Sequence, residues 1–170
     1  MNEVSSKTFG HVIAFLIPGF VVVWAFRPFS PTLSSWLGSS EQAVSIGGFF
    51  YATIVSLVAG LIVSAIRATL LDFIHHRTGI SRPDLDYSKL QANTDAFIIV
   101  IEQLYRYYQF YANMFVAVFV AYGARLVSIR QYPWTEVELA LAFIALEAVL
   151  FLACRDSLRR SYLRLMQVMS

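Results

Sequence analysis

Four long apolar stretches alternate with shorter polar segments along the chain. They occupy residues 8–26, 47–66, 107–124 and 137–154. A bilayer core about 30 Å thick requires roughly 20 apolar residues in a helix, because each residue rises about 1.5 Å. Of the 24 Asp, Glu, Lys and Arg residues, only Glu138 and Glu147 lie inside these stretches. The pattern therefore predicts an all-α integral membrane protein, built as a bundle of four transmembrane helices.

The composition favours the same class of protein. The chain has 170 residues, of which 58% are hydrophobic and 14% are charged. A typical soluble domain is about 45–50% apolar and about 25% charged, and a soluble chain this short cannot bury so much apolar surface. The net charge of +2 does not favour nucleic-acid binding, and the single cysteine excludes an internal disulfide framework. We expect a chain that is solvated by the lipid bilayer and binds no nucleic acid.

The basic residues predict the orientation of the chain. Ten of the 13 Lys and Arg residues lie in the N-terminal segment, the 67–106 loop and the 155–170 tail. The other three lie in the two loops on the opposite side. The positive-inside rule therefore places both termini and the 67–106 loop in the cytoplasm, with the protein in the inner membrane. The build resembles that of small four-span bacterial membrane proteins, although no motif assigns the chain to a family.

The 67–106 loop has the pattern of a helical hairpin. The second helix can continue to Arg77, where Thr78-Gly79 stops it, since glycine is favoured after a helix end. The third helix can begin near Ala96 and run without a break towards Ile129. Helices two and three are therefore expected to extend into the cytoplasm.

Two further segments lie outside the four stretches. The first loop, at 27–46, contains the helix breakers Pro28 and Pro31 and is interpreted as a plain connector. The 155–170 tail has the apolar periodicity of an amphipathic helix. Two placements remain open for this tail: on the inner leaflet or the loop helices, or in line with the fourth helix.

Polar residues in or beside the apolar stretches are the candidate site residues. Glu147 and Asn113 have a similar predicted depth. Two interpretations of Glu147 remain open: a functional carboxylate that faces the bundle or a water path, or a protonated side chain that bonds to Asn113 or to a backbone carbonyl freed by Pro18. One polar face runs along helix three from the cytoplasm into the bilayer, and it consists of Glu102, Arg106, Gln109 and Asn113. This face indicates either an ion pair between Glu102 and Arg106 or the lining of a hydrated vestibule.

Small residues form a stripe along the second stretch. They recur at every fourth position, as Ala52, Ser56, Gly60, Ser64 and Ala68. Such a stripe lets a neighbouring helix approach closely. The pattern leaves open whether that neighbour belongs to the same chain or to a second copy.

Catalytic chemistry has weak support in the sequence. Asp72, His75 and His76 are close together, but adjacent histidines point in different directions on a helix, and a metal site needs about three or four convergent ligands. The chain contains no G-x-S-x-G, H-E-x-x-H, Walker A, G-x-G-x-x-G or C-x-x-C motif. We therefore expect no metal site, no cofactor and no enzymatic activity.

Three functions are ranked on these grounds. The first is a non-enzymatic bundle that assembles as a homo-oligomer and forms a pore or channel, or acts as a membrane sensor or effector. The second is a membrane anchor or adaptor that presents the 67–106 loop and the tail to a cytosolic partner protein. The third is a lipid-modifying membrane enzyme that uses Asp72, His75 and His76.

Overall fold

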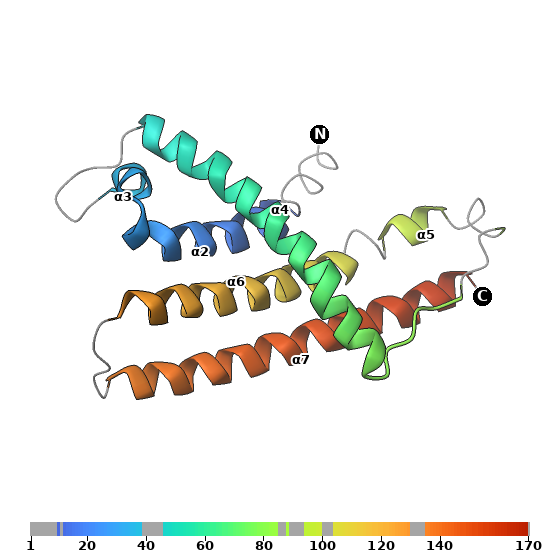
Figure 1. Cartoon of the computed structure of the whole chain (residues 1–170). Coiled ribbons are helices and arrows are strands. Elements are labelled where there is room, and N and C mark those ends of the chain that lie inside the picture. Colours follow the sequence, from blue (N-terminus) through green and yellow to red (C-terminus); the bar gives the residue numbers. More distant parts are fainter. Residues whose placement is uncertain are drawn as a thin grey trace.

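The computed structural model describes residues 10, 12–38, 46–84, 88, 94–99, 104–129 and 135–169, and every regular element in this part of the chain is a helix (Figure 1). Four helical segments are long and apolar enough to cross a membrane: Val12–Phe29, Ile46–Arg77, Arg106–Ser128 and Glu136–Val168. The prediction of an all-helical chain with four such helices is confirmed.

The first span contains a break in regular α-helical geometry. It begins as a π-helical turn, Val12–Leu16, and continues as α2, Ile17–Phe26. Pro18 lacks the backbone N–H that an α-helix would bond to the carbonyl of Ala14. The wider π-helical turn lies at the position where this hydrogen bond cannot form.

The segment after α2, interpreted as a connector, is helical in part. It contains a 3-10 turn, Arg27–Phe29, and a short helix, α3, Pro31–Leu37. Pro31 occupies the start of α3, where a missing N–H leaves no helical hydrogen bond unmade. The hydroxyl of Ser30 accepts a hydrogen bond from the Leu33 N–H at 3.3 Å and caps the helix.

The remaining elements are α4, Ile46–Arg77, α5, Thr94–Ile99, α6, Arg106–Ser128, and α7, Thr135–Met169. As predicted, α4 continues to Arg77, and Gly79 follows with a positive φ of 98°. The helix predicted from Ala96 to Ile129 corresponds to α5 and α6, and residues 100–103 between them lie outside the described part. The tail forms the straight continuation of α7.

The helices pack through a series of neighbours. Helix α2 contacts both α4 and α6, and α6 in turn contacts α7. Figure 1 shows α2, α6 and α7 side by side, with α4 crossing them obliquely. The C-terminal part of α4 thereby reaches α7, where one buried cluster includes Leu71, Tyr108, Ala112, Cys154 and Leu158.

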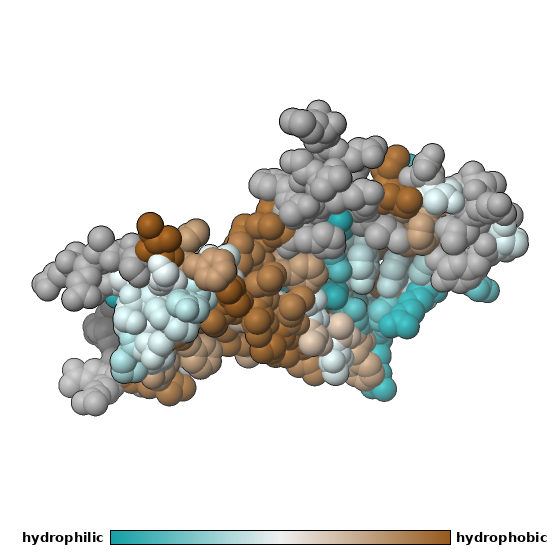
Figure 2. Space-filling view, turned by 90° about the horizontal axis from the view of Figure 1, so that it is seen from above, coloured by the Kyte–Doolittle hydropathy of each residue, from teal (hydrophilic) through white to brown (hydrophobic). Residues whose placement is uncertain are grey.

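Apolar side chains cover the outside of the helices. Large side chains such as Leu61, Ile144 and Leu152 are more than half exposed. Figure 2 shows hydrophobic residues gathered across the middle of the visible face, with hydrophilic residues towards one end. An apolar exterior of this extent is costly in water and is the natural surface in lipid.

Candidate functional site: polar contacts between the helices

The small-residue stripe of α4 packs against α2 of the same chain. A Cβ atom on Gly60 would lie 2.0 Å from the carbonyl oxygen of Phe15, and one on Gly19 would lie 1.8 Å from that of Ser56. The two backbones therefore approach so closely that only glycine fits at Gly19 and Gly60. The neighbour that the sequence left open is thus α2.

The stripe does not stay buried along its whole length. Ala52, Ser56 and Gly60 are buried, whereas Ser64 is half-buried and Ala68 is exposed. A step of four residues turns a helix by about 40° more than a full circle, so a stripe at that spacing drifts around the helix axis. Beyond Gly60 the buried face of α4 continues through Val63, Arg67, Leu71 and His75. Two of these side chains, Arg67 and His75, are polar or charged, and the neighbouring Asp72 is partly buried.

Asn113 ties α6 to the irregular turn before α2. Its side chain is fully buried, and its amide nitrogen donates a hydrogen bond to the carbonyl oxygen of Ala14 at 2.8 Å. This is the carbonyl that Pro18 leaves without its α-helical donor. A carbonyl freed by Pro18 is therefore satisfied by a buried side chain, as expected, but the donor is Asn113 and not Glu147.

Glu147 has no polar partner in the described part of the chain. It is 8% exposed, and neither carboxylate oxygen makes a hydrogen bond there. One turn before it, Phe143 stacks on Tyr122 of α6, and one turn after it, Phe151 packs near Phe115. Glu147 therefore lies level with α6 residues between Phe115 and Tyr122. The expected hydrogen bond to Asn113 is not formed, because the Asn113 amide faces Ala14.

The rest of the predicted polar face is only partly described. Gln109 and Arg106 are half-buried on α6. The Arg106 side chain lies against Gly10, where an added Cβ would meet its guanidinium at 2.1 Å. Glu102 lies outside the described residues, so its ion pair with Arg106 stays a prediction.

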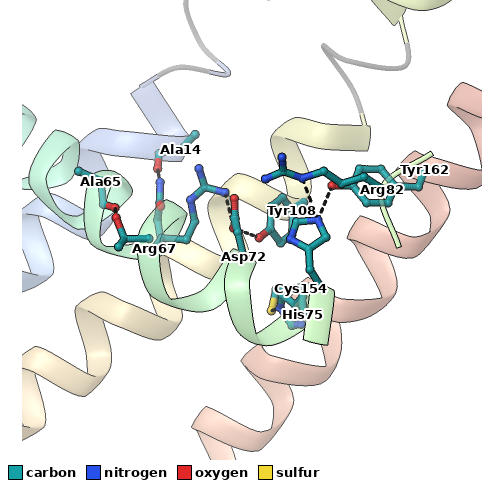
Figure 3. Close-up of polar contacts among 12 residues, drawn as sticks. Ala14, Ala65, Arg67, Asp72, His75, Arg82, Tyr108, Cys154 and Tyr162 are labelled. Carbon is teal, nitrogen blue, oxygen red and sulfur yellow. Dashed lines mark hydrogen bonds and ion pairs between the residues drawn. The ribbon is translucent and has the colours of Figure 1, made fainter. Parts of the chain in front are cut away.

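A buried ion pair within α4, near Cys154, is linked to α6 through Tyr108 (Figure 3). Arg67 is 4% exposed, and its guanidinium lies 3.3 Å from the carboxylate of Asp72. The hydroxyl of the fully buried Tyr108 donates to the same carboxylate. The Arg67 guanidinium also lies 5.3 Å from the centre of the Tyr108 ring. Sequence reasoning singled out Asp72 but not Arg67, five positions earlier on the same helix. It missed Tyr108 because nothing local links Asp72 to a residue 36 positions away.

The two adjacent histidines have separate partners. His75 Nε2 lies 3.2 Å from the sulfur of Cys154, and His76 Nε2 lies 3.1 Å from the hydroxyl of Tyr162. The Nε–H of Arg82 also points to His76, at 3.4 Å. Because His76 Nε2 accepts from Arg82, the hydroxyl of Tyr162 is the donor in its contact with the same nitrogen.

Arg155 fastens the turn after α4 to α7. Its guanidinium donates to the hydroxyl of Thr78 at 2.7 Å and to the carbonyl of the same residue at 2.6 Å. Together with the His76–Tyr162 contact, this bidentate interaction holds residues 76–82 against α7. The end of α4 and the continuation of α7 therefore form one connected surface.

These contacts do not assemble a catalytic or metal-binding constellation. Asp72, His75 and His76 each have different partners, and no group of three His, Cys, Asp or Glu side chains in the described residues could hold a metal ion. Comparisons of the chain with protein-family models, with curated proteins and with solved structures find no match. The helices define the class of the chain, an α-helical protein with four segments long and apolar enough to cross a membrane.

Proposed function

We propose that the protein is a non-enzymatic membrane anchor or adaptor in the bacterial inner membrane, which presents a preformed helical surface to a cytosolic partner protein. The observation that carries this proposal is the set of contacts from Arg155 and Tyr162 to residues 76–82. A surface that is already ordered loses little conformational entropy when a partner binds.

The length of α7 supports the proposal. Its 35 residues correspond to about 52 Å at about 1.5 Å per residue, well beyond a bilayer core of about 30 Å. The exposed positions after Cys154 include Asp156, Arg159, Arg160 and Arg164, which belong in water. The positive-inside rule places this end, with both termini, in the cytoplasm.

Helix α4 contributes less projecting surface than α7. Its large exposed side chains remain apolar as far as Phe73 and Ile74. An oblique helix needs more residues to cross the same thickness of lipid, so the inner boundary lies near His75, next to Cys154 of α7. The surface offered to a partner then consists of residues 76–84 and of α7 after Cys154.

A site-specific photocrosslinker tests this proposal in cells of the native host. We expect a crosslinker at Leu163, an exposed position of α7, to capture a cytosolic protein in the wild-type background. Arg155→Ala releases the Thr78 turn and should reduce this crosslink several-fold at equal abundance in the membrane. Arg125→Ala is the matched control, because it removes an arginine contact, to Glu136, at the opposite end of α6 and α7. Equal crosslinking in both variants, or none in the wild type, would contradict the adaptor function.

A second function, a homo-oligomeric pore or a membrane sensor, is favoured by one observation. The buried carboxylate of Glu147 has no hydrogen-bond partner in the described residues. A carboxylate at membrane depth is by default a functional candidate, because it is costly there and needs a proton, a cation or a water path. The small-residue stripe no longer argues for a second copy, since α2 covers it.

Glu147→Gln and Glu147→Leu separate this second function from a structural role. If Glu147 serves a conducting or proton-sensing path, Glu147→Gln should leave the fold and assembly intact and abolish ion flux in liposomes or its pH dependence. Glu147→Leu removes the polar group altogether and should have the same effect on flux. Wild-type flux, oligomer size and pH response in both variants would exclude Glu147 from any such path.

A further inference from the structure

Helix α2 carries an aromatic ridge on its outward surface. Phe20 and Trp24 lie one turn apart, with ring centres 6.0 Å from each other. Their side chains are 43% and 49% exposed. The ridge lies in the half of α2 that ends at Arg27, which the predicted topology places in the outer leaflet.

Two grooves share this ridge as a common wall. One groove, of about 390 Å³, lies between α2, α3 and α4, and its lining includes Leu16, Trp36 and Thr53. The other, of about 550 Å³, lies between α2 and α6, and its lining includes Ala25 and Ala121. Phe20 and Trp24 line both grooves. The grooves therefore run along the two flanks of one aromatic ridge.

Helix α3 covers one side of the first groove and is held in place by specific contacts. The ring of Trp36 on α3 stacks on Tyr51 of α4 at 5.4 Å. The hydroxyl of Ser34 donates to the carbonyl of Arg27 at 3.0 Å, which holds α3 against the end of α2. The lining of the first span runs from Leu16, at the end of the π-helical turn, to Trp24 on α2, or about 12 Å along the helix axis.

Two arginines lie near this ridge, one beside Trp24 and one in the lining of the second groove. The guanidinium of Arg27 lies 5.3 Å from the centre of the Trp24 ring. Arg125 lines the second groove and pairs with Glu136. An anionic group next to Trp24 would lie over the ridge and beside the Arg27 guanidinium, at the level where a phospholipid carries its phosphate.

We propose that these grooves form a binding site for one diacyl phospholipid, which sits astride the Phe20–Trp24 ridge. One acyl chain occupies each groove, and the phosphate lies beside Arg27. Two flanking grooves match two acyl chains, and the volumes fall in the range of about 300–1,000 Å³ typical of small-molecule sites. The charge of Arg27 favours a phospholipid as the occupant over a helix from a second copy.

Quenching of tryptophan fluorescence by lipid tests the binding site without changing any residue that lines the grooves. Trp134, which lies outside the described residues, is replaced by phenylalanine, so that Trp24 and Trp36 are the only fluorescent tryptophans of the three in the chain. The probe is phosphatidylglycerol with brominated acyl chains, mixed into phosphatidylcholine liposomes. We expect the quenching of tryptophan fluorescence to saturate at a mole fraction of brominated lipid well below one half. Quenching that simply follows its mole fraction would mean ordinary contact with bulk lipid and would overturn the proposal.

Native mass spectrometry with groove-filling variants tests the location. We expect wild type to retain one phosphatidylglycerol per chain. Thr53→Phe and Ala121→Phe together fill both grooves and should lower its affinity about tenfold, which corresponds to about 1.4 kcal/mol. Val58→Phe, at an exposed position of α4 outside the grooves, is the matched control and should retain the lipid. Arg27→Gln should weaken binding of phosphatidylglycerol but not of diacylglycerol, which has no phosphate.

Three results would overturn the proposal. They are equal lipid retention in the control and the folded groove-filling variant, an equal loss of both lipids in Arg27→Gln, and a lipid-free dimer that buries the ridge. Thermal melting of each variant in detergent establishes that it is folded. If the double variant does not fold, Thr53→Phe alone and the quenching experiment decide the question.

Discussion

Replacing Gly60 with alanine or leucine is expected to force α2 and α4 apart. Even the single methyl group of alanine would lie 2.0 Å from the carbonyl oxygen of Phe15, and this neighbour is backbone that cannot rotate away. Overpacking of a core costs about 1–3 kcal/mol, and we expect Gly60→Ala to lie at the upper end of that range. Gly60→Leu should exceed it and yield little folded protein. Thermal denaturation in detergent, followed by circular dichroism, measures both effects.

Glycines elsewhere in the chain provide the matched controls. An added Cβ on Gly47 of α4 or Gly123 of α6 meets nothing within 4 Å. Alanine is favoured over glycine inside a helix by roughly 0.5–1 kcal/mol, so Gly123→Ala should be neutral or stabilising. If Gly60→Ala behaves like Gly123→Ala, α2 and α4 do not pack at this position.

The helices themselves could be predicted because lipid imposes a simple requirement on sequence. A spanning segment must be about 20 residues long, apolar and hydrogen-bonded within itself. The stretch at 107–124 lies within α6, and the continuation of the second helix to Arg77 is present in α4. Each of these features is encoded by neighbouring residues, so no knowledge of the rest of the chain was needed.

The partners of the polar residues could not be predicted in the same way. Asn113 and Ala14 are 99 positions apart, and His76 and Tyr162 are 86 positions apart. Depth along a helix does not determine which neighbouring helix a side chain faces. Asn113 faces the turn before α2, and for this reason it does not reach Glu147 although the two residues seemed matched in depth.

Arg67 illustrates a related limit. A charge next to an apolar stretch indicates a membrane boundary only if the charge meets lipid or water. Arg67 is buried against Asp72 and Tyr108, and large apolar side chains such as Leu70 and Phe73 remain exposed on α4 beyond it. The helix start at Ser30-Pro31 is encoded locally, by an N-cap residue followed by proline, but the two prolines of this loop were interpreted only as helix breakers.

Asp72→Ala is expected to destabilise the contact between α4 and α6 strongly. The substitution leaves the Arg67 guanidinium buried without its carboxylate and deprives the Tyr108 hydroxyl of its acceptor. Breaking a buried ion pair from one side costs about 3–5 kcal/mol. The measurement is the free energy of unfolding, or the melting temperature in detergent where unfolding is not reversible. Asp72→Asn keeps an acceptor for Tyr108 but loses the charge, so it should fall between wild type and Asp72→Ala.

Two comparisons isolate the buried charge as the cause. Asp156 pairs with Arg160 on an exposed face of α7. Asp156→Ala should leave the stability unchanged, because water solvates two separate exposed charges almost as well as the pair stabilises them. Arg67→Leu combined with Asp72→Leu removes both charges, and a buried pair replaced by apolar residues is often no less stable. We therefore expect the double variant to be more stable than Asp72→Ala alone. If it is less stable, the loss in Asp72→Ala comes from the Tyr108 hydrogen bond and the shape of the site, and not from an unpaired Arg67.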